Sequence, residues 1–334
     1  MLPLIDIARR AQGELLGRLG LDPRESPYRV VATGAGWRLR DYGGRPDGPA
    51  LLIVAAPIKR PYIWDLSPST SVVRHCRAQG LQVRLLEWEE PAPGAGAAGL
   101  ADYAGRALGE AVTAATRTGD RHRPILVGHS LGGTLAASFA ALAPERVGGV
   151  VLLGAPLCFH AGVSRFRDAL VRIAPARVPT AVVPGTLLSQ LAVLAAPEAF
   201  VWARLLDAVA SSADPRAWET HLRVERWALD EMPLAGPLVE EILTDLFRED
   251  RLGRGTLELA GRTVGPAAIR TPMLAVACSA DEVAPPASVL PFAAALPAGL
   301  ATVLTHPGEV GVGLQHLAIL LGRLTGGRAP QATL

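Results

Sequence analysis

Alternating strand and helix patterns restrict the fold of this chain more than any other feature of its sequence. A hairpin-like pattern at 28–43 is followed by apolar, strand-like segments that alternate with segments of helical periodicity. The strand patterns lie at 50–57, 81–88, 124–128 and 149–156, and the helical patterns between them at 69–79, 101–117 and 131–143. Because strands joined through helices run parallel with right-handed crossovers, the sequence predicts an α/β protein with a mostly parallel central sheet.

The alternation stops after residue 156 and resumes late in the chain. Residues 157–250 carry mostly helical patterns, whereas strand patterns return at 271–278 and 301–305. We therefore expect a core formed by residues 28–156 and 251–325. Residues 157–250 would be inserted into that core as a helical cap, or lid.

The chain has 334 residues, and its composition is that of a globular protein. Hydrophobic residues make up 49% and charged residues 19%, which excludes disorder over most of the length. The apolar residues of 1–27 recur at helical spacing and predict an amphipathic helical segment. The polar residues 326–334 contain glycine and proline and predict a flexible tail.

Charge and motifs exclude several classes of function. A net charge of +2, from 33 basic and 31 acidic residues, is too balanced to indicate nucleic acid as a partner. Cys76, Cys158 and Cys278 show no CxxC spacing, and neither a GxxxxGK[ST] phosphate loop nor an HExxH zinc motif occurs, so we expect no disulfides, metal or cofactor. No apolar run reaches the roughly 18 residues of a spanning helix, and no signal-peptide pattern opens the chain. We expect no membrane insertion and a cytoplasmic location.

The stretch LVGHSLGG at 126–133 places Ser130 between Gly128 and Gly132, directly after a strand pattern and before a helical one. In that context a GxSxG motif predicts a sharp strand-to-helix turn that raises the serine oxygen above the sheet. The backbone N–H of Leu131 would then be free to stabilise an oxyanion. We expect the second donor in the loop after strand 50–57, and Ile58 is our choice because Pro57 has no N–H.

A nucleophilic serine needs a histidine and an acid, which follow it in chain order in this arrangement. Asp281 follows strand 271–278 and is the expected acid. His306 directly follows the last strand and is the preferred base, whereas His316 lies within an apolar helical pattern that favours a packing or surface role. His129 adjoins the serine on a tight turn, so we expect it to support the turn rather than act as the base.

Longer motifs resemble one known family. APIKRPYIWDLSPSTSVVRHCRAQGL at 56–81, VGHSLGGTLAASFAALAPERVGGVVLLGAPLCF at 127–159 and IRTPMLAVACSADEVAPPAS at 269–288 are similar to the class III polyhydroxyalkanoate synthases. GLDPRESP near the start and segment 224–264 extend the resemblance over most of the chain. It implies the α/β-hydrolase fold, acyl thioester substrates such as hydroxyacyl-coenzyme A, and a helical cap that gates the site.

The chain departs from this family at catalytic positions. Ser130 stands where the family carries a nucleophilic cysteine, and a hydroxyl depends on a general base more than a thiol does. The family's GGHxGV pattern matches GEVGV at 308–312 best, which puts Glu309 at the place of the catalytic histidine. Lys59 stands where the family has an asparagine, and a cation there could stabilise an oxyanion.

Three functions remain open. The preferred one is a serine acyl hydrolase or acyltransferase that acts on an ester, or on a thioester of coenzyme A or a carrier protein, through Ser130, His306 and Asp281. The second is a polyhydroxyalkanoate synthase that uses serine and forms a homodimer or binds a second subunit. The third is a catalytically silent scaffold whose triad is broken at the histidine.

Overall fold

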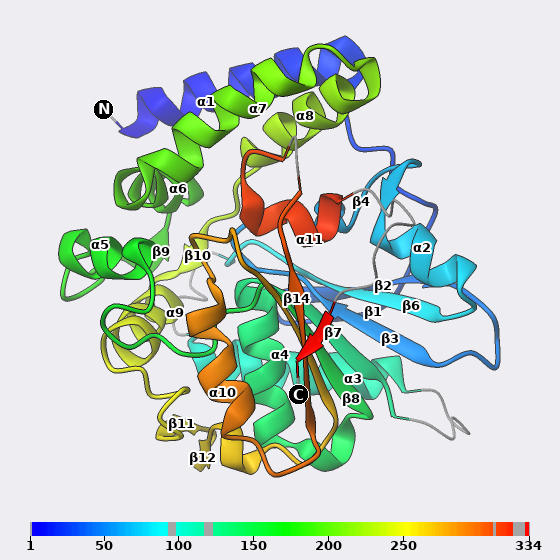
Figure 1. The fold of residues 1–334 in the computed structure, drawn as a ribbon, viewed down its shortest axis with the longest axis vertical. Helices are drawn as coiled ribbons and strands as arrows, with labels where there is room; N and C mark the ends of the chain where they lie inside the picture. Colours follow the sequence, from blue (N-terminus) through cyan, green and yellow to red (C-terminus); the bar gives the residue numbers. More distant parts are fainter. Residues whose placement is uncertain (1, 93–97, 117–122, 310–311, 323–330, 334) are drawn as a thin grey trace.

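A nine-stranded mixed sheet forms the centre of the part of the protein that the structure describes (Figure 1). The computed structural model describes residues 2–92, 98–116, 123–309, 312–322 and 331–333. The strand order is β1 (Arg29–Gly34), β2 (Trp37–Gly43), β6 (Gln82–Trp88), β3 (Ala50–Val54), β7 (Ile125–His129), β8 (Gly149–Leu153), β13 (Met273–Cys278), β14 (Ala301–His306) and β15 (Gln331–Thr333). Strands β6 to β14 run parallel, whereas β1, β2 and β15 pair antiparallel at the two edges. The predicted α/β class with a mostly parallel sheet is confirmed.

Side-chain alternation along β3 divides the core into two layers. Leu52 and Val54 pack on one face, under α3 (Leu108–Ala115) and α4 (Leu131–Leu142). Leu51 and Ile53 pack on the other face, with α2 (Val72–Ala78) and α11 (Ala318–Leu321). Because helices cover both faces, central strands such as β3 and β8 are apolar along their whole length.

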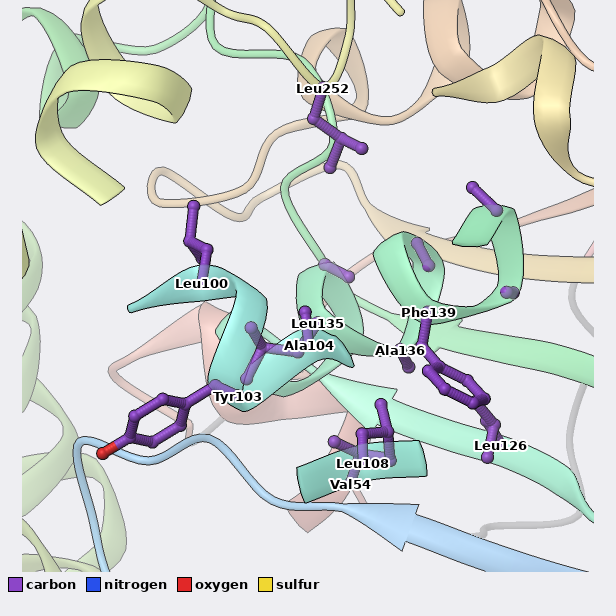
Figure 2. Close-up of a cluster of buried hydrophobic side chains, with 14 of the residues drawn as sticks. Val54, Leu100, Tyr103, Ala104, Leu108, Leu126, Leu135, Ala136, Phe139 and Leu252 are labelled. Atoms are coloured by element: carbon purple, nitrogen blue, oxygen red, sulfur yellow. The ribbon is translucent and has the colours of Figure 1, made fainter. Parts of the chain in front are cut away.

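The α3–α4 layer holds the helix that begins next to Ser130. Figure 2 shows Leu108 beside Val54 and Phe139 of α4 beside Leu126 of β7. All four side chains are almost wholly excluded from solvent. Burial on this scale contributes about 1.5–3 kcal/mol per large apolar side chain and fixes α4 against the sheet.

Residues 157–250, the segment that we expected to form a cap, are mostly helical, and we use the name cap for this segment. Its elements are α5 (Arg165–Ile173), β9 (Val182–Val183), α6 (Gly185–Ala195), η5 (Glu198–Trp202), α7 (Ala203–Ser211), α8 (Pro215–Ala228), β10 (Leu234–Ala235), α9 (Gly236–Glu241) and η6 (Ile242–Arg248). Figure 1 shows these helices beside and above the sheet. Helices α5 and α8 begin at side-chain caps, because Ser164 accepts from the N–H of Arg167 and Asp214 accepts from that of Arg216.

Helix α1 (Leu2–Leu16) and the following turn η1 (Gly17–Leu21) pack on the cap. Arg9 forms an ion pair with Glu231 at 2.6 Å, and Arg223 of α8 donates to the backbone oxygen of Asp22 at 2.5 Å. Gly20 ends the helical segment with a φ of 83°, a conformation that glycine adopts at little cost. The predicted N-terminal helix is therefore present, and it rests on cap helices α6 and α8.

The remaining elements connect the sheet strands. They are η2 (Pro61–Trp64), β4 (Asp65–Ser67), β5 (Thr70–Ser71), η3 (Ala101–Ala107), η4 (Pro144–Arg146), β11 (Leu257–Leu259), β12 (Arg262–Val264), η7 (Pro266–Ala268), η8 (Pro286–Ser288), α10 (Leu290–Ala294) and η9 (Gln315–Leu317). Among the described residues no single helix has the length and hydropathy to cross a bilayer; α6 and the η5–α7 helix meet that test only as a pair, which is bent by 107°.

Residues Gln331–Thr333 form β15, which pairs antiparallel with Val303 to Thr305 of β14. Most of the predicted flexible tail at 326–334 lies outside the described residues. Without β15, β14 would present the unpaired N–H and C=O groups of an edge strand. The need to pair these groups accounts for an ordered strand in a segment of polar composition.

Glycines allow close contact between α4 and the loop after β3. A methyl group on Gly132 would lie 2.2 Å from the Val54 carbonyl oxygen and 2.9 Å from the carbonyl carbon of Ala55. Similarly, a methyl group on Gly133 would lie 2.4 Å from Cβ of Ala155. The helix after Ser130 can therefore approach the sheet only because these positions lack a Cβ.

We predict that Gly132→Ala lowers the free energy of unfolding by about 1–3 kcal/mol, because the added methyl group forces α4 away from backbone atoms. Chemical denaturation measures the effect. Gly105→Ala is the matched control, since a methyl group there meets only Leu142 Cδ2 at 3.5 Å. It should leave stability unchanged or raise it by up to about 1 kcal/mol. Equal effects at both positions would contradict this account of the packing.

Candidate active site

Ser130 occupies a strained turn between β7 and α4. Its φ of 54° and ψ of −134° lie outside the regions that L-residues favour. The turn is held by its backbone, because the N–H of Ser130 donates to the Leu153 oxygen at 3.2 Å and the Ser130 oxygen accepts from Gly133 N–H at 2.9 Å. Gly128 and Gly133 nearly touch, since a Cβ on Gly128 would lie 2.5 Å from the Gly133 Cα. The missing side chain of Gly128 thus allows the sharp strand-to-helix turn that the GxSxG motif predicts.

Asp281 is buried in the loop after β13, at the carboxyl end of the strand. One carboxylate oxygen accepts from the N–H groups of Val283 and Ala284 at 2.8 and 2.9 Å. The other oxygen lies 2.7 Å from Nδ1 of His316. Burial by itself raises the pKa of this carboxyl, but the imidazole and the two N–H groups outweigh it and hold the pKa below its ordinary value. Asp281 is therefore a carboxylate that orients His316.

His316 lies on the short helix η9 and is buried. With the Nδ1 proton donated to Asp281, the Nε2 atom carries the lone pair of the neutral ring. This Nε2 is buried and has no hydrogen-bond partner among the described residues. A buried polar atom without a partner is rare in proteins and marks a position where a proton donor can bind.

His306 and Glu309 are located differently from what the sequence suggested. The structure does not bring His306 to Asp281: its Nδ1 accepts from Gly308 N–H at 3.1 Å, and its backbone oxygen accepts from Ser279 N–H at 2.9 Å. His306 is still part of β14, opposite Cys278, so the strand fixes its backbone away from the turn at Ser130. The expected pairing of Asp281 with His306 is thus corrected to a pairing with His316.

Glu309 is held through its backbone. Its N–H donates to Gln315 Oε1 at 2.9 Å, and its oxygen accepts from Gln315 Nε2 at 2.9 Å. No hydrogen bond joins the Glu309 carboxylate to Ser130, Asp281 or His316 in the described part of the chain. The Gln315 amide therefore folds the loop after β14 back on itself, and this loop presents the neighbouring His316 to Asp281.

His129 supports the imidazole from the other side. Its Nε2 lies 2.7 Å from the His316 backbone oxygen, and the two rings are 4.6 Å apart between centroids. Burial, with a smaller contribution from His316, lowers the pKa of His129 to about 3. The ring is therefore neutral near pH 7, and its Nε2 carries the proton that the carbonyl accepts. The sequence suggested that His129 supports the turn at Ser130, whereas its side-chain contacts in the structure are with His316.

The expected oxyanion donors lie on either side of the turn. The N–H of Leu131 is at the first position of α4, where an α-helix leaves its N–H groups without an internal acceptor. Ile58 follows β3, and its backbone oxygen accepts from Met232 N–H of the cap segment at 3.3 Å. Leu131 and Ile58 line the same cavity as Ser130. Their donation to an oxyanion remains a proposal.

Lys59, which the sequence suggested as a cation for an oxyanion, contacts the cap instead. Its Nζ donates to the Ala228 oxygen at 2.5 Å and lies 3.5 Å from the Glu231 carboxylate. Burial lowers the pKa of Lys59 to about 8, although Glu231 acts in the opposite direction. The side chain is neither a surface lysine nor a free cation beside Ser130. It ties the loop after β3 to the cap.

One cavity of about 1460 Å³ joins the core to the cap. Ser130, His129 and His316 line it, together with residues from α5 to η6 of the cap. A second histidine–carboxylate pair, His221 and Asp207, also lines it, with 2.6 Å between His221 Nδ1 and Asp207 Oδ2. Within the described residues, no group of three or more His, Cys, Asp or Glu side chains is suited to hold a metal ion.

The sequence patterns did not reveal that His316 pairs with Asp281 or that His221 pairs with Asp207. His316 follows the last parallel strand, as the chain order of such triads requires, and this order was the available signal. The apolar pattern of GLQHLAILL concealed it, because that pattern is also typical of a histidine packed in a core. No local signal links Asp207 to His221, since the contact depends on how α7 meets α8.

The strained serine turn, the buried His316–Asp281 pair and the capped parallel sheet define an α/β-hydrolase fold. A family model described as "Protein of unknown function (DUF3141)" matches residues 86–319, and the chain belongs to this family. A solved monoacylglycerol lipase of Paleococcus ferrophilus superposes with a TM-score of 0.52 at 15% identity, covering 81% of this chain and 88% of the lipase. At that identity the likeness supports the fold alone.

The expected resemblance to polyhydroxyalkanoate synthases is confirmed among curated proteins. The chain is 32% identical over 279 residues to the poly(3-hydroxyalkanoate) polymerase subunit PhaC of Haloferax mediterranei. That alignment covers 80% of this chain but only 56% of the Haloferax protein. The polymerase subunit PhaC of Synechocystis is 26% identical over 305 residues, covering 88% of this chain and 80% of that protein.

We predict that His129 makes the folded protein less stable as the pH falls. The unfolded chain binds a proton at His129 near its ordinary pKa of 6.5, whereas the folded state resists protonation down to about 3. Stability should therefore decrease as pH falls from 6.5 towards 3, by at most about 1.4 kcal/mol per pH unit from this group. The measurement is the free energy of unfolding between pH 7 and 4.5.

His129→Gln removes this contribution and should flatten the slope. His75→Gln is the control, because His75 is an exposed histidine of α2. The control should keep the slope of the unmodified protein. If His129→Gln leaves the slope unchanged, His129 is not the buried neutral ring described here.

Proposed function

We propose that the chain is a serine-dependent acyl hydrolase or acyltransferase in which Ser130 is the nucleophile, His316 the general base and Asp281 the residue that orients it. The observation that carries the proposal is the His316 ring. Its Nδ1 is fixed by Asp281 at 2.7 Å, and its Nε2 is buried without a hydrogen-bond partner among the described residues. His316 and Ser130 line the same cavity. A base with this arrangement can accept the serine proton.

The chemistry follows from these groups. Ser130 Oγ attacks the carbonyl carbon of an ester or thioester while His316 Nε2 takes its proton, and the oxyanion is held by the N–H groups of Leu131 and Ile58. When the tetrahedral adduct collapses, the alcohol or thiol leaves with the proton from His316. Water or another acceptor then loses a proton to His316 as it attacks the acyl-serine. The bond between the acyl carbon and Ser130 Oγ breaks, His316 returns the proton to Oγ, and the acyl group leaves on the acceptor. The names of the relatives, which are poly(3-hydroxyalkanoate) polymerase subunits, support acyl transfer. Acyl thioesters of coenzyme A or a carrier protein are the substrates that the resemblance in sequence implies.

Covalent labelling of Ser130 by a fluorophosphonate tests the assignment. We predict that Ser130→Ala abolishes labelling and that His316→Ala slows it by about 10²- to 10⁴-fold, because no base then takes the serine proton. His306→Ala is the matched control, and Glu309→Ala tests the position suggested by the family pattern. Both variants should label at nearly the unmodified rate. Slow labelling of His306→Ala together with rapid labelling of His316→Ala would contradict the proposal.

A second candidate is a polyhydroxyalkanoate polymerase that uses serine, and the curated relatives favour it. Their names describe them as polymerase subunits, so a second subunit belongs to this candidate. Incubating the purified protein with hydroxyacyl-coenzyme A distinguishes the hydrolase from the polymerase. A hydrolase releases the free hydroxy acid, whereas a polymerase builds oligomers on Ser130. Mass spectrometry detects oligomers attached to the protein and free hydroxy acid among the soluble products.

The third candidate is a silent scaffold, which was suggested because Glu309 stands where the family has its catalytic histidine. The pairing of His316 with Asp281 weakens this candidate, because it supplies a histidine beside the acid. A protein that fails to label with fluorophosphonate at Ser130, although folded, would restore the scaffold as the preferred function.

We also predict that Gly313→Ala impairs the site through His316, three residues further along. A methyl group there would lie 2.2 Å from the Ala203 carbonyl oxygen and 2.7 Å from the Asp207 Cβ, so the loop must move away from α7. A shift of this kind should slow fluorophosphonate labelling by about tenfold to a hundredfold. Gly105→Ala is the control, and circular dichroism checks that both variants are folded. Unchanged labelling of a folded Gly313→Ala protein would show that the contact with α7 does not position His316.

A further inference from the structure

Four phenylalanines line the cap side of the cavity, and we call them the aromatic wall: Phe159, Phe166, Phe200 and Phe247. Phe159 follows β8, whereas the other three come from α5, η5 and η6. The rings contact one another, with centroid distances of 5.0 Å for Phe159–Phe247, 5.9 Å for Phe166–Phe200 and 6.5 Å for Phe166–Phe247. Segments that are distant in the sequence thus combine into one apolar surface.

Aliphatic side chains extend this wall. Leu170 of α5, Leu188 of α6 and Leu243 of η6 line the same cavity. Leu188 is half-buried and packs against the core, whereas Leu194 of the same helix is 68% exposed and lies outside the cavity lining. Helix α6 therefore turns one leucine towards the cavity and another towards solvent.

Three of the cations that line the cavity, Arg9, Lys59 and Arg204, have partners within the protein. Arg9 and Lys59 share the Glu231 carboxylate, at 2.6 and 3.5 Å. Arg204 donates to the Glu225 carboxylate at 2.7 Å. Because carboxylates already compensate these three charges, the part of the cavity that they line is better suited to an uncharged chain than to an anion.

The size of the cavity restricts the occupant further. Its volume of about 1460 Å³ exceeds the roughly 300–1,000 Å³ that suffices for most small-molecule ligands. A short acyl group attached to Ser130 would leave much of the apolar surface in contact with water. A longer alkyl chain would cover that surface and gain its transfer free energy.

We propose that the aromatic wall and the leucines beside it bind the alkyl part of a medium- or long-chain fatty acyl substrate whose carbonyl carbon lies at Ser130. The inference rests on the proposed function for the reaction, but the binding of the chain does not depend on catalysis. Leu188 and the four phenylalanines are then specificity-determining residues, and the acyl chain is the feature of the substrate that the cap selects.

The first experiment compares p-nitrophenyl butyrate, octanoate and dodecanoate. We expect kcat/KM to rise from butyrate to octanoate by at least tenfold, since each buried methylene contributes up to about fourfold, equivalent to about 0.8 kcal/mol. Leu188→Trp fills the cavity and should remove most of this preference while butyrate is still hydrolysed. Leu194→Trp, the same change on the exposed face of α6, should retain it. Phe200→Trp is a second filling variant in case Leu188→Trp fails to fold.

The second experiment measures binding without turnover. A fluorescent fatty acid should bind the Ser130→Ala protein, be displaced by dodecanoate rather than butyrate, and bind at least tenfold more weakly when Leu188→Trp is added. Binding of this kind without activity on any ester supports the inference and counts against the proposed function. Hydrolysis that is fastest with butyrate, or the absence of fatty acid binding in a folded protein, overturns the inference.

Discussion

The hydrogen bond between Asp281 and His316 is the interaction on which the rest of the site depends. A buried carboxylate is costly unless every oxygen has a partner, and here two backbone N–H groups satisfy one oxygen while the imidazole satisfies the other. The same bond fixes the ring and leaves Nε2 as the only atom of His316 able to accept a proton. Removing Asp281 would therefore free the ring to rotate, and it would also leave His316 buried without its acceptor.

The cap contributes to the site as well as covering it. Gly313, on the loop that carries His316, contacts α7, and Lys59, on the loop that carries Ile58, is bound by Ala228 and Glu231. Both loops that would complete the chemistry are thus held from the cap side, whereas Ser130 and Asp281 are held by the sheet. It follows that movement of the cap would change the positions of His316 and Ile58 without disturbing Ser130.

Much of the fold could be predicted from sequence because its signals are local. The strands β3 and β8 are apolar runs, and the turn at Ser130 needs glycines at fixed positions, so pattern and sterics agree. Asp281 could be predicted for the same reason, since it directly follows a buried strand. His316 could not, because its place depends on the path of a loop that Gln315 folds back and that α7 supports. The β15 strand was missed because the pairing partner, rather than its own composition, orders it.

The central claim is that His316, oriented by Asp281, serves Ser130. A crystal structure of the protein after reaction with a fluorophosphonate tests it most directly, because the phosphonyl group mimics the tetrahedral adduct on the serine. The account predicts His316 Nε2 within hydrogen-bond distance of the Ser130 oxygen or the phosphonyl group, with the phosphonyl oxygen at the N–H of Leu131. A phosphonylated Ser130 that is approached by His306 or Glu309, with His316 still unpartnered, would contradict it.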